Sequence, residues 1–125
     1  MAADYTVKRI DEMELVGPMK RARAELGVTS FGLQVFDFPP GFEDYPEHDH
    51  AGEGQEEVYV ALRGSGEVEV DGERVALDGG NMIRIGPGAR RKLWPGPEGI
   101  RILALGGVPG KAFEPARVTE LDEPD

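Results

Sequence analysis

The chain has 125 residues, the size of one domain, and its formal net charge at pH 7 is -10. That charge argues against nucleic acid or an anionic membrane surface as a partner, because both require cationic patches. The chain contains no cysteine, which excludes disulfide bonds, thiolate catalysis and cysteine-based zinc sites. We find no signal-like leader and no apolar run of ~20 residues, so we expect a soluble, cytoplasmic protein with no membrane segment.

The N-terminal part is predicted to hold a short strand around Val7–Ile10 and a short helix over Pro18–Leu26. Proline suits the first turn of a helix, and Gly27 suits the position just past its end. We therefore expect residues 1–30 to lie outside the main body. Residues 111–125 are rich in proline and acidic residues, which predicts a tail that is frayed or pairs with a neighbouring subunit.

From residue 31 the pattern becomes that of short strands separated by turn residues, with 18 glycines and 10 prolines in the chain. Valine alternates with glutamate over Glu67–Val70, and Asp71-Gly72 then predicts a two-residue hairpin turn. Closely spaced short strands of this kind are typical of an antiparallel sandwich or barrel, so we expect one all-β domain over residues 31–110. The strands predicted within it are 31–38, 57–62, 67–70, 74–77, 82–85, 91–94 and 100–105.

The only two histidines, His48 and His50, are separated by one residue. In an extended strand such positions face the same side, about 7 Å apart along the backbone. Glu57 follows at the head of an apolar run that ends at Leu62. Two histidines and one carboxylate, with open positions left over, are the ligand set of catalytic metals such as non-heme Fe(II). The pattern therefore predicts a metal site formed by His48, His50 and Glu57.

The segment 41–64 runs from a glycine through the His-x-His pair to a glutamate and, with six residues between, to a second glycine. This order resembles the first motif of the cupin superfamily, and the stretch 41–106 is similar to the barrel of that family. The resemblance implies a double-stranded β-helix, or jelly-roll barrel. It also implies a divalent metal ion (Fe, Mn, Ni or Zn), a small-molecule ligand and a homodimer.

The second motif of the family ends in a Pro-x-Gly-x-x-His turn, and here the histidine position is occupied by Arg91. In metal-binding cupins that histidine is a ligand. Arginine cannot replace it, because a guanidinium stays protonated and offers only hydrogen-bond donors.

The spacer between the histidine pair and the glutamate is also longer than the family pattern. This leaves Glu53, Glu56 and Glu57 as candidates for the carboxylate ligand, and the spacing back from Gly64 favours Glu57.

Two hypotheses follow. In the first, the protein is a metal-dependent binder or enzyme, of dioxygenase or isomerase type if it is an enzyme, and Arg91 holds an anionic group of the substrate. In the alternative, it is a metal-free binding or regulatory cupin in which Arg91 pairs with Glu57 or holds an anionic ligand. Strand parity adds further candidates for the pocket lining beside Arg91, namely Tyr59, Arg84, Met82 and Phe36.

Overall fold

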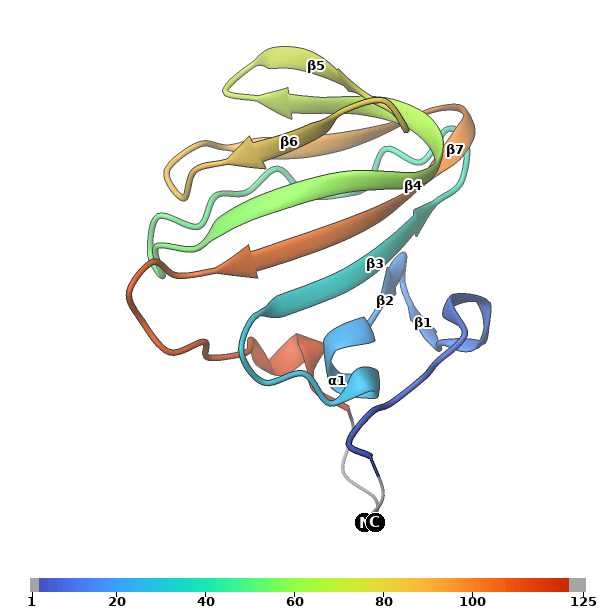
Figure 1. Ribbon diagram of the computed structural model, residues 1–125. Coiled ribbons are helices and arrows are strands. Elements are labelled where there is room, and N and C mark those ends of the chain that lie inside the picture. The colour runs from blue at the N-terminus through green and yellow to red at the C-terminus, as the bar shows by residue number, and fades with distance from the viewer. Residues whose placement is uncertain (1–2, 122–125) are drawn as a thin grey trace.

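The computed structural model describes residues 3–121, and strands make up most of it (Figure 1). Seven strands form one sheet in the order β1-β2-β3-β7-β4-β5, with β6 paired to β4, and every pairing is antiparallel. This is the all-β jelly-roll class predicted from the sequence. The elements are η1 (Ile10–Glu12), β1 (Leu15–Val16), β2 (Met19–Lys20), α1 (Ala22–Leu26), β3 (Gly32–Phe38), β4 (Glu56–Val70), β5 (Glu73–Leu77), β6 (Met82–Ile85), β7 (Arg91–Gly107) and η2 (Arg117–Thr119).

Strands β4 and β7 are long, with 15 and 17 residues, where the sequence predicted two short strands each. Their pairing has register shifts near Ala61 and near Gly64. Gly64 has a φ of +74°, and a Cβ there would overlap the carbonyl oxygen of Gly99. The glycine therefore bends the strand pair and does not end it, because a bulge keeps the ladder running while it changes its direction.

The main core lies on the inner face of the sheet. Tyr59 and Ala61 of β4, Ile102 of β7 and Ile85 of β6 are all buried there, and the residues between them point to the outer face. The strong alternation on β4 and β7 therefore sets which side chains can reach the interior. The other members of this core include Phe38, Val68, Leu77, Leu93, Ile100 and Ala104.

The N-terminal prediction needs correction. Pro18 lies in the turn between β1 and β2, and the helix begins only at Ala22. Met19 instead pairs with Phe36 of β3, so strand pairing with the sheet prevails over the helical pattern of the isolated segment. The helix does end as predicted, since Gly27 is left-handed and its N–H donates to the Arg23 carbonyl. The predicted strand at Val7–Ile10 is absent, and Ile10 begins a 3-10 turn.

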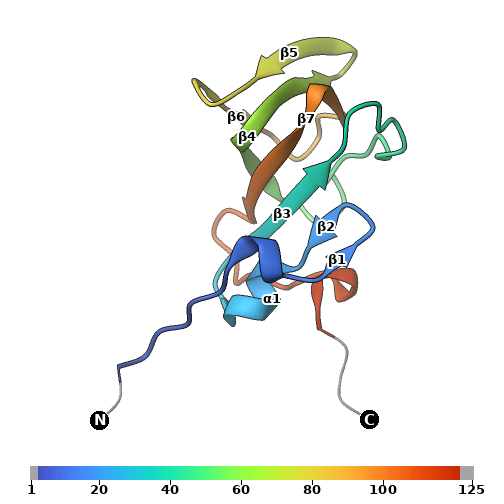
Figure 2. The same ribbon diagram turned by 90° about the vertical axis from the view of Figure 1, so that its right-hand side faces the viewer.

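The predicted hairpin is confirmed, because Val70 and Glu73 are paired across a two-residue turn. Asp71 and Gly72 both have positive φ, as a type I′ turn requires. After β7 the chain returns to α1, and η2 lies beside that helix (Figure 1, Figure 2). Glu120 makes an ion pair with Arg23 at 2.9 Å, so the described part of the tail contacts α1, although most of its residues are exposed. Between residues 3 and 121, no helix is long and apolar enough to cross a membrane.

Candidate metal centre and ligand cavity

The polar segment between β3 and β4 is attached to the sheet at both histidines. His48 and Arg91 exchange two main-chain hydrogen bonds, of 3.0 and 2.7 Å. The His50 N–H donates to the Pro87 carbonyl at 2.8 Å. These bonds hold the segment in an extended form, and the two imidazole rings lie 5.0 Å apart, nearly perpendicular to each other.

Each imidazole has an acceptor at Nδ1. His48 Nδ1 lies 3.1 Å from the Pro46 carbonyl, and His50 Nδ1 contacts the Glu53 carboxylate. An imidazole that donates from Nδ1 presents its lone pair at Nε2. Acceptors of this kind commonly fix the tautomer and orientation of histidines that bind metals.

The Glu57 side chain, which begins β4, is largely buried, with 12% of its surface exposed. Its Oε1 accepts hydrogen bonds from Arg91 Nη1 at 2.7 Å and from the Tyr59 hydroxyl at 2.9 Å. Burial raises the pKa of Glu57, but these donors and the adjacent His50 together lower it below its usual value. The carboxylate is therefore ionised at neutral pH.

His50 Nε2 lies 3.2 Å from Glu57 Oε1, is shielded from solvent and makes no well-aligned hydrogen bond. The Glu57 carboxylate raises the pKa of His50, burial opposes this rise, and Glu53 adds to it. Burial also holds the pKa of Tyr59 well above its ordinary range, so its hydroxyl remains a donor to Glu57.

Arg91 lies behind Glu57 and has no exposed surface. Beyond the bond to Glu57, its Nη2 donates to the carbonyls of Gly86 and Ala89 at 2.7 and 2.9 Å. The guanidinium therefore donates hydrogen bonds to the β6–β7 turn and to the Glu57 carboxylate. It lies at the position of the missing histidine ligand, but it acts as an ion-pair partner inside the protein.

The three residues predicted to bind a metal come together. His48, His50 and Glu57 each offer a ligand atom, and these atoms lie within 4.8 Å of one another. The buried Nε2 of His50 makes no well-aligned hydrogen bond although it lies 3.2 Å from Glu57 Oε1, and Glu57 Oε2 has only a long contact of 3.5 Å from Gln55. This donor set fits a divalent cation with open coordination positions. Glu56 instead pairs with Arg84 at 2.9 Å, and Glu53 supports His50.

A cavity of about 460 Å³ opens beside these residues. Phe36 lines it as predicted, whereas Tyr59 lies buried under Glu57. Met82 is 69% exposed and Arg84 lies on the same outer face of β6, because the inner face of that strand carries Ile83 and Ile85. The lining comprises Met19, Gly32, Leu33, Gln34, Phe36, Tyr45, His48, His50, Glu53, Gln55, Glu57, Ala104, Gly106, Phe113, Glu114, Ala116, Val118 and Thr119.

Several of these lining residues were missed by the sequence reasoning. Gln34 is two residues before Phe36 on β3, so strand parity applied to β3 would have found it. Tyr45 is one of two aromatic residues, with Phe42, in the otherwise polar segment between β3 and β4. Phe113 could not have been found, because its place depends on the path of the chain after β7.

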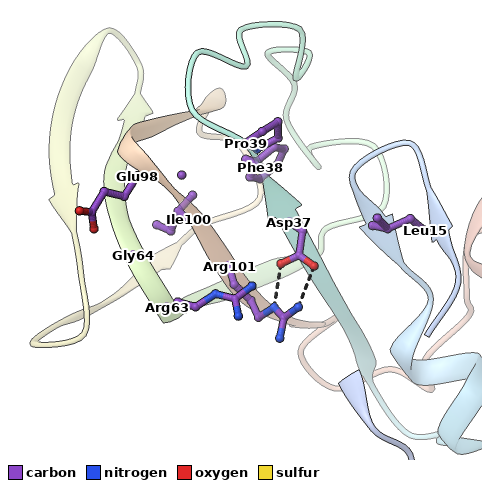
Figure 3. A pocket seen from close by; sticks show the side chains of 10 residues that line it. Leu15, Asp37, Phe38, Pro39, Arg63, Gly64, Glu98, Ile100 and Arg101 are labelled. Atoms are coloured by element: carbon purple, nitrogen blue, oxygen red, sulfur yellow. Dashed lines mark hydrogen bonds and ion pairs between the residues drawn. The ribbon is translucent and has the colours of Figure 1, made fainter. Parts of the chain in front are cut away.

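A larger hollow of about 580 Å³ lies elsewhere and contains none of the predicted site residues (Figure 3). Its charged wall includes Arg101, whose guanidinium donates to both oxygens of Asp37 at 2.7 and 2.9 Å. Asp11 takes a third bond from the same guanidinium at 2.7 Å. Arg101 is thus neutralised by its own neighbours, and neither histidine lines this hollow.

Comparison with known proteins agrees with this geometry. A family model described as "Cupin domain" matches residues 34–106. A cupin protein from Bacteroides fragilis superposes with a TM-score of 0.72 at 22% identity, over 98% of this chain and 99% of that chain. An RmlC-like cupin protein from Desulfovibrio desulfuricans superposes with a TM-score of 0.55 at 23% identity, over 62% of this chain and 72% of that chain.

The DMSP lyase DddQ from Ruegeria pomeroyi gives a TM-score of 0.55 at 26% identity, over 67% of this chain and 42% of that chain. A comparison with curated protein sequences gives no match. The family match covers more than half of the chain and includes the histidines, Glu57 and Arg91. The chain therefore belongs to the cupin family.

Proposed function

We propose that this protein is a metal-binding cupin that binds or transforms a small molecule in the cavity beside His48, His50 and Glu57. One observation carries the proposal: both imidazoles are held at Nδ1, and the ligand atoms of all three residues lie within 4.8 Å of one another. Such an arrangement is prepared for a cation before the cation arrives, which reduces the cost of ordering the site.

The residues of the chain have separable roles in this proposal. His48, His50 and Glu57 hold the ion, while Tyr59 and Arg91 orient the carboxylate through Oε1. A bound divalent ion would supply Lewis-acid polarisation or oxygen activation, which are the chemistries of isomerase-type and dioxygenase-type cupins respectively. The apolar part of the lining would exclude water from a ligand beside the ion.

Metal content measured by elemental mass spectrometry tests the proposal. The untagged protein, purified without chelator and incubated with Fe, Mn, Ni or Zn, should hold near-stoichiometric metal. The His48→Ala/His50→Ala variant should hold none. Glu57→Gln should bind much less metal, whereas its neighbour Glu56→Gln should bind as the wild type does, because Glu56 pairs with Arg84 on the outer face.

The alternative is a metal-free binding or regulatory cupin. The observation in its favour is the 2.7 Å ion pair between Arg91 and Glu57, which places a fixed positive charge next to the site. Absence of metal from the wild type under all four loading conditions would support this alternative and reject the metal-binding proposal. Arg91→His, which removes the charge and adds an imidazole, should then create metal binding that the wild type lacks.

We further propose that the protein is a homodimer through the outer face of β4, β6 and β7. Cross-strand neighbours build a continuous apolar surface there, and Arg84 and Glu56 beside it carry opposite charges that a two-fold partner could share. Analytical ultracentrifugation should show a dimer that Val60→Lys disrupts and that Ala76→Lys, on exposed β5, leaves intact. The apolar rows are Met82–Val60 and, beside it, Val58–Leu105, whereas Leu103 of the same face packs against the N-terminal cluster of Met13, Ala22 and Val35.

A further inference from the structure

The charge of the cavity wall is strongly one-sided. Three carboxylates line it, those of Glu53, Glu57 and Glu114, and no lysine or arginine of the described chain lies among the lining residues. Arg91 offsets Glu57 from behind, but it has no exposed surface and each of its three nitrogens already donates within the protein. With Arg91 counted, the three carboxylates leave a formal charge of about -2 without metal and about zero with a divalent ion. An anionic ligand is therefore repelled by the metal-free protein and meets no net positive charge in the metal-bound one.

The rest of the wall suits an apolar body. Phe36 and Tyr45 meet edge to face with ring centroids 5.7 Å apart, and Tyr45 packs in the same way on the His48 ring at 5.5 Å. Phe113 and Val118 of the tail close the side that the sheet leaves open. Aromatic faces attract apolar groups and cations, and they offer nothing to a carboxylate.

Besides His50 Nε2, one more polar atom on this wall makes no hydrogen bond within the described residues. Gln34 projects from β3, and its Oε1 is shielded from solvent and accepts no hydrogen bond within residues 3–121. A buried carbonyl oxygen without a donor is destabilising and is uncommon in native proteins. A ligand with an N–H or O–H group would satisfy it, while a carboxylate, which only accepts, would not.

We propose that this cavity takes an uncharged or cationic ligand with an apolar body and an N–H or O–H donor, and that it rejects carboxylates. This inference rests on the proposed function, because it assigns the ligand class of the same site. It also replaces the sequence-based hypothesis that Arg91 receives an anionic substrate, since that guanidinium is held inside the protein.

Three probes that share a phenyl ring and differ in charge test the proposal: benzylamine, benzamide and benzoate. Their affinities are measured by ligand-observed NMR at pH 7, with the protein free of metal and again with metal added. We expect benzylamine and benzamide to bind at least about fivefold more tightly than benzoate in both states. Equal or tighter binding of benzoate in both states would overturn the proposal, as would the absence of measurable binding for all three probes.

Two variants connect the preference to the named residues. Glu114→Gln lies away from the histidines and should reduce the advantage of benzylamine over benzoate by about twofold or more, whereas Glu73→Gln on exposed β5 should leave it unchanged. Gln34→Leu keeps the approximate size of the side chain but removes the amide. It should therefore weaken the binding of benzamide more than the binding of toluene, a fourth probe that has the same ring and no polar group. A preference for the amine without stoichiometric metal would contradict only the proposed metal site. Stoichiometric metal with a preference for benzoate would contradict only this inference.

Discussion

Replacing Arg91 by methionine should destabilise the protein strongly, because the buried carboxylate of Glu57 would lose its charged partner. The substitution also leaves the carbonyls of Gly86 and Ala89 without the guanidinium donors that reach them at 2.7 and 2.9 Å. Breaking a buried ion pair costs about 3–5 kcal/mol. Glu57 still accepts a hydrogen bond from the Tyr59 hydroxyl, so we expect the free energy of unfolding to fall by the low end of this range, about 3 kcal/mol. For a chain of this length, that loss lowers Tm by about 10 °C.

The assay is urea unfolding of the metal-free protein followed by circular dichroism, with Arg90→Met as the matched control. Arg90 is the preceding residue, and its half-exposed side chain pairs with Glu47 at 2.8 Å on the surface. Replacing Arg90 by methionine should lower the free energy of unfolding by less than about 1 kcal/mol. A double-mutant cycle with Glu57→Gln isolates the pair, and we expect the two substitutions to be clearly non-additive.

The same variant separates stability from metal affinity. Removing a positive charge beside Glu57 should strengthen the binding of a divalent ion by at least about tenfold, as measured by competition with a chelating dye. A loss of stability below about 1 kcal/mol in Arg91→Met would refute the reasoning, since it would mean that Glu57 does not depend on the guanidinium. Unchanged metal affinity would show that the guanidinium does not act on the site electrostatically.

Three further outcomes are expected. Gly64→Ala should lower the free energy of unfolding by about 3 kcal/mol or more, because a Cβ at this positive φ would overlap the Gly99 carbonyl oxygen. In the control Gly72→Ala, φ is also positive but the space is open, so the loss measured by urea unfolding should be only about 1 kcal/mol. The hydrogen bonds from Arg101 lower the pKa of Asp37 below its ordinary value of 3.8, so this pair stabilises the protein above about pH 4 and the contribution is lost as the pH falls further. The urea midpoint should therefore drop between pH 6 and pH 3, and Arg101→Met should make that drop smaller. Added metal should raise Tm in the wild type and leave His48→Ala/His50→Ala unchanged.

Local sequence patterns were enough to predict much of the fold. The turn at Asp71-Gly72 follows from the few conformations that two residues with positive φ allow. The alternation along β4 placed Tyr59 inward, and the His-x-His spacing placed both imidazoles near Glu57, because both depend on the two-residue period of an extended chain. These features needed no knowledge of the rest of the molecule.

The sequence favoured Glu57 over Glu53 and Glu56 by its spacing to Gly64, but the structural reason for that preference is visible only in the folded chain. All three precede or begin the same strand, and only the pairing of β4 with β6 and β7 turns Glu57 inward and Glu56 out toward Arg84. The sequence likewise could not place Pro18 in a turn, since the pairing of Met19 with β3 is a contact between distant segments.

The sequence by itself determined where extended segments lie from residue 31 onward, the hairpin and the group of residues able to hold a metal, because these depend on the periodicity of neighbouring residues. The tertiary structure decided which charged and polar groups the cavity presents to a ligand. Arg91 is the clearest case: its identity suggests a receptor for anions, but it is fully buried and donates to Glu57 and to the β6–β7 turn, so it presents no exposed donor to a ligand. A side chain's chemistry is set by its type, whereas its availability depends on what the fold packs against it.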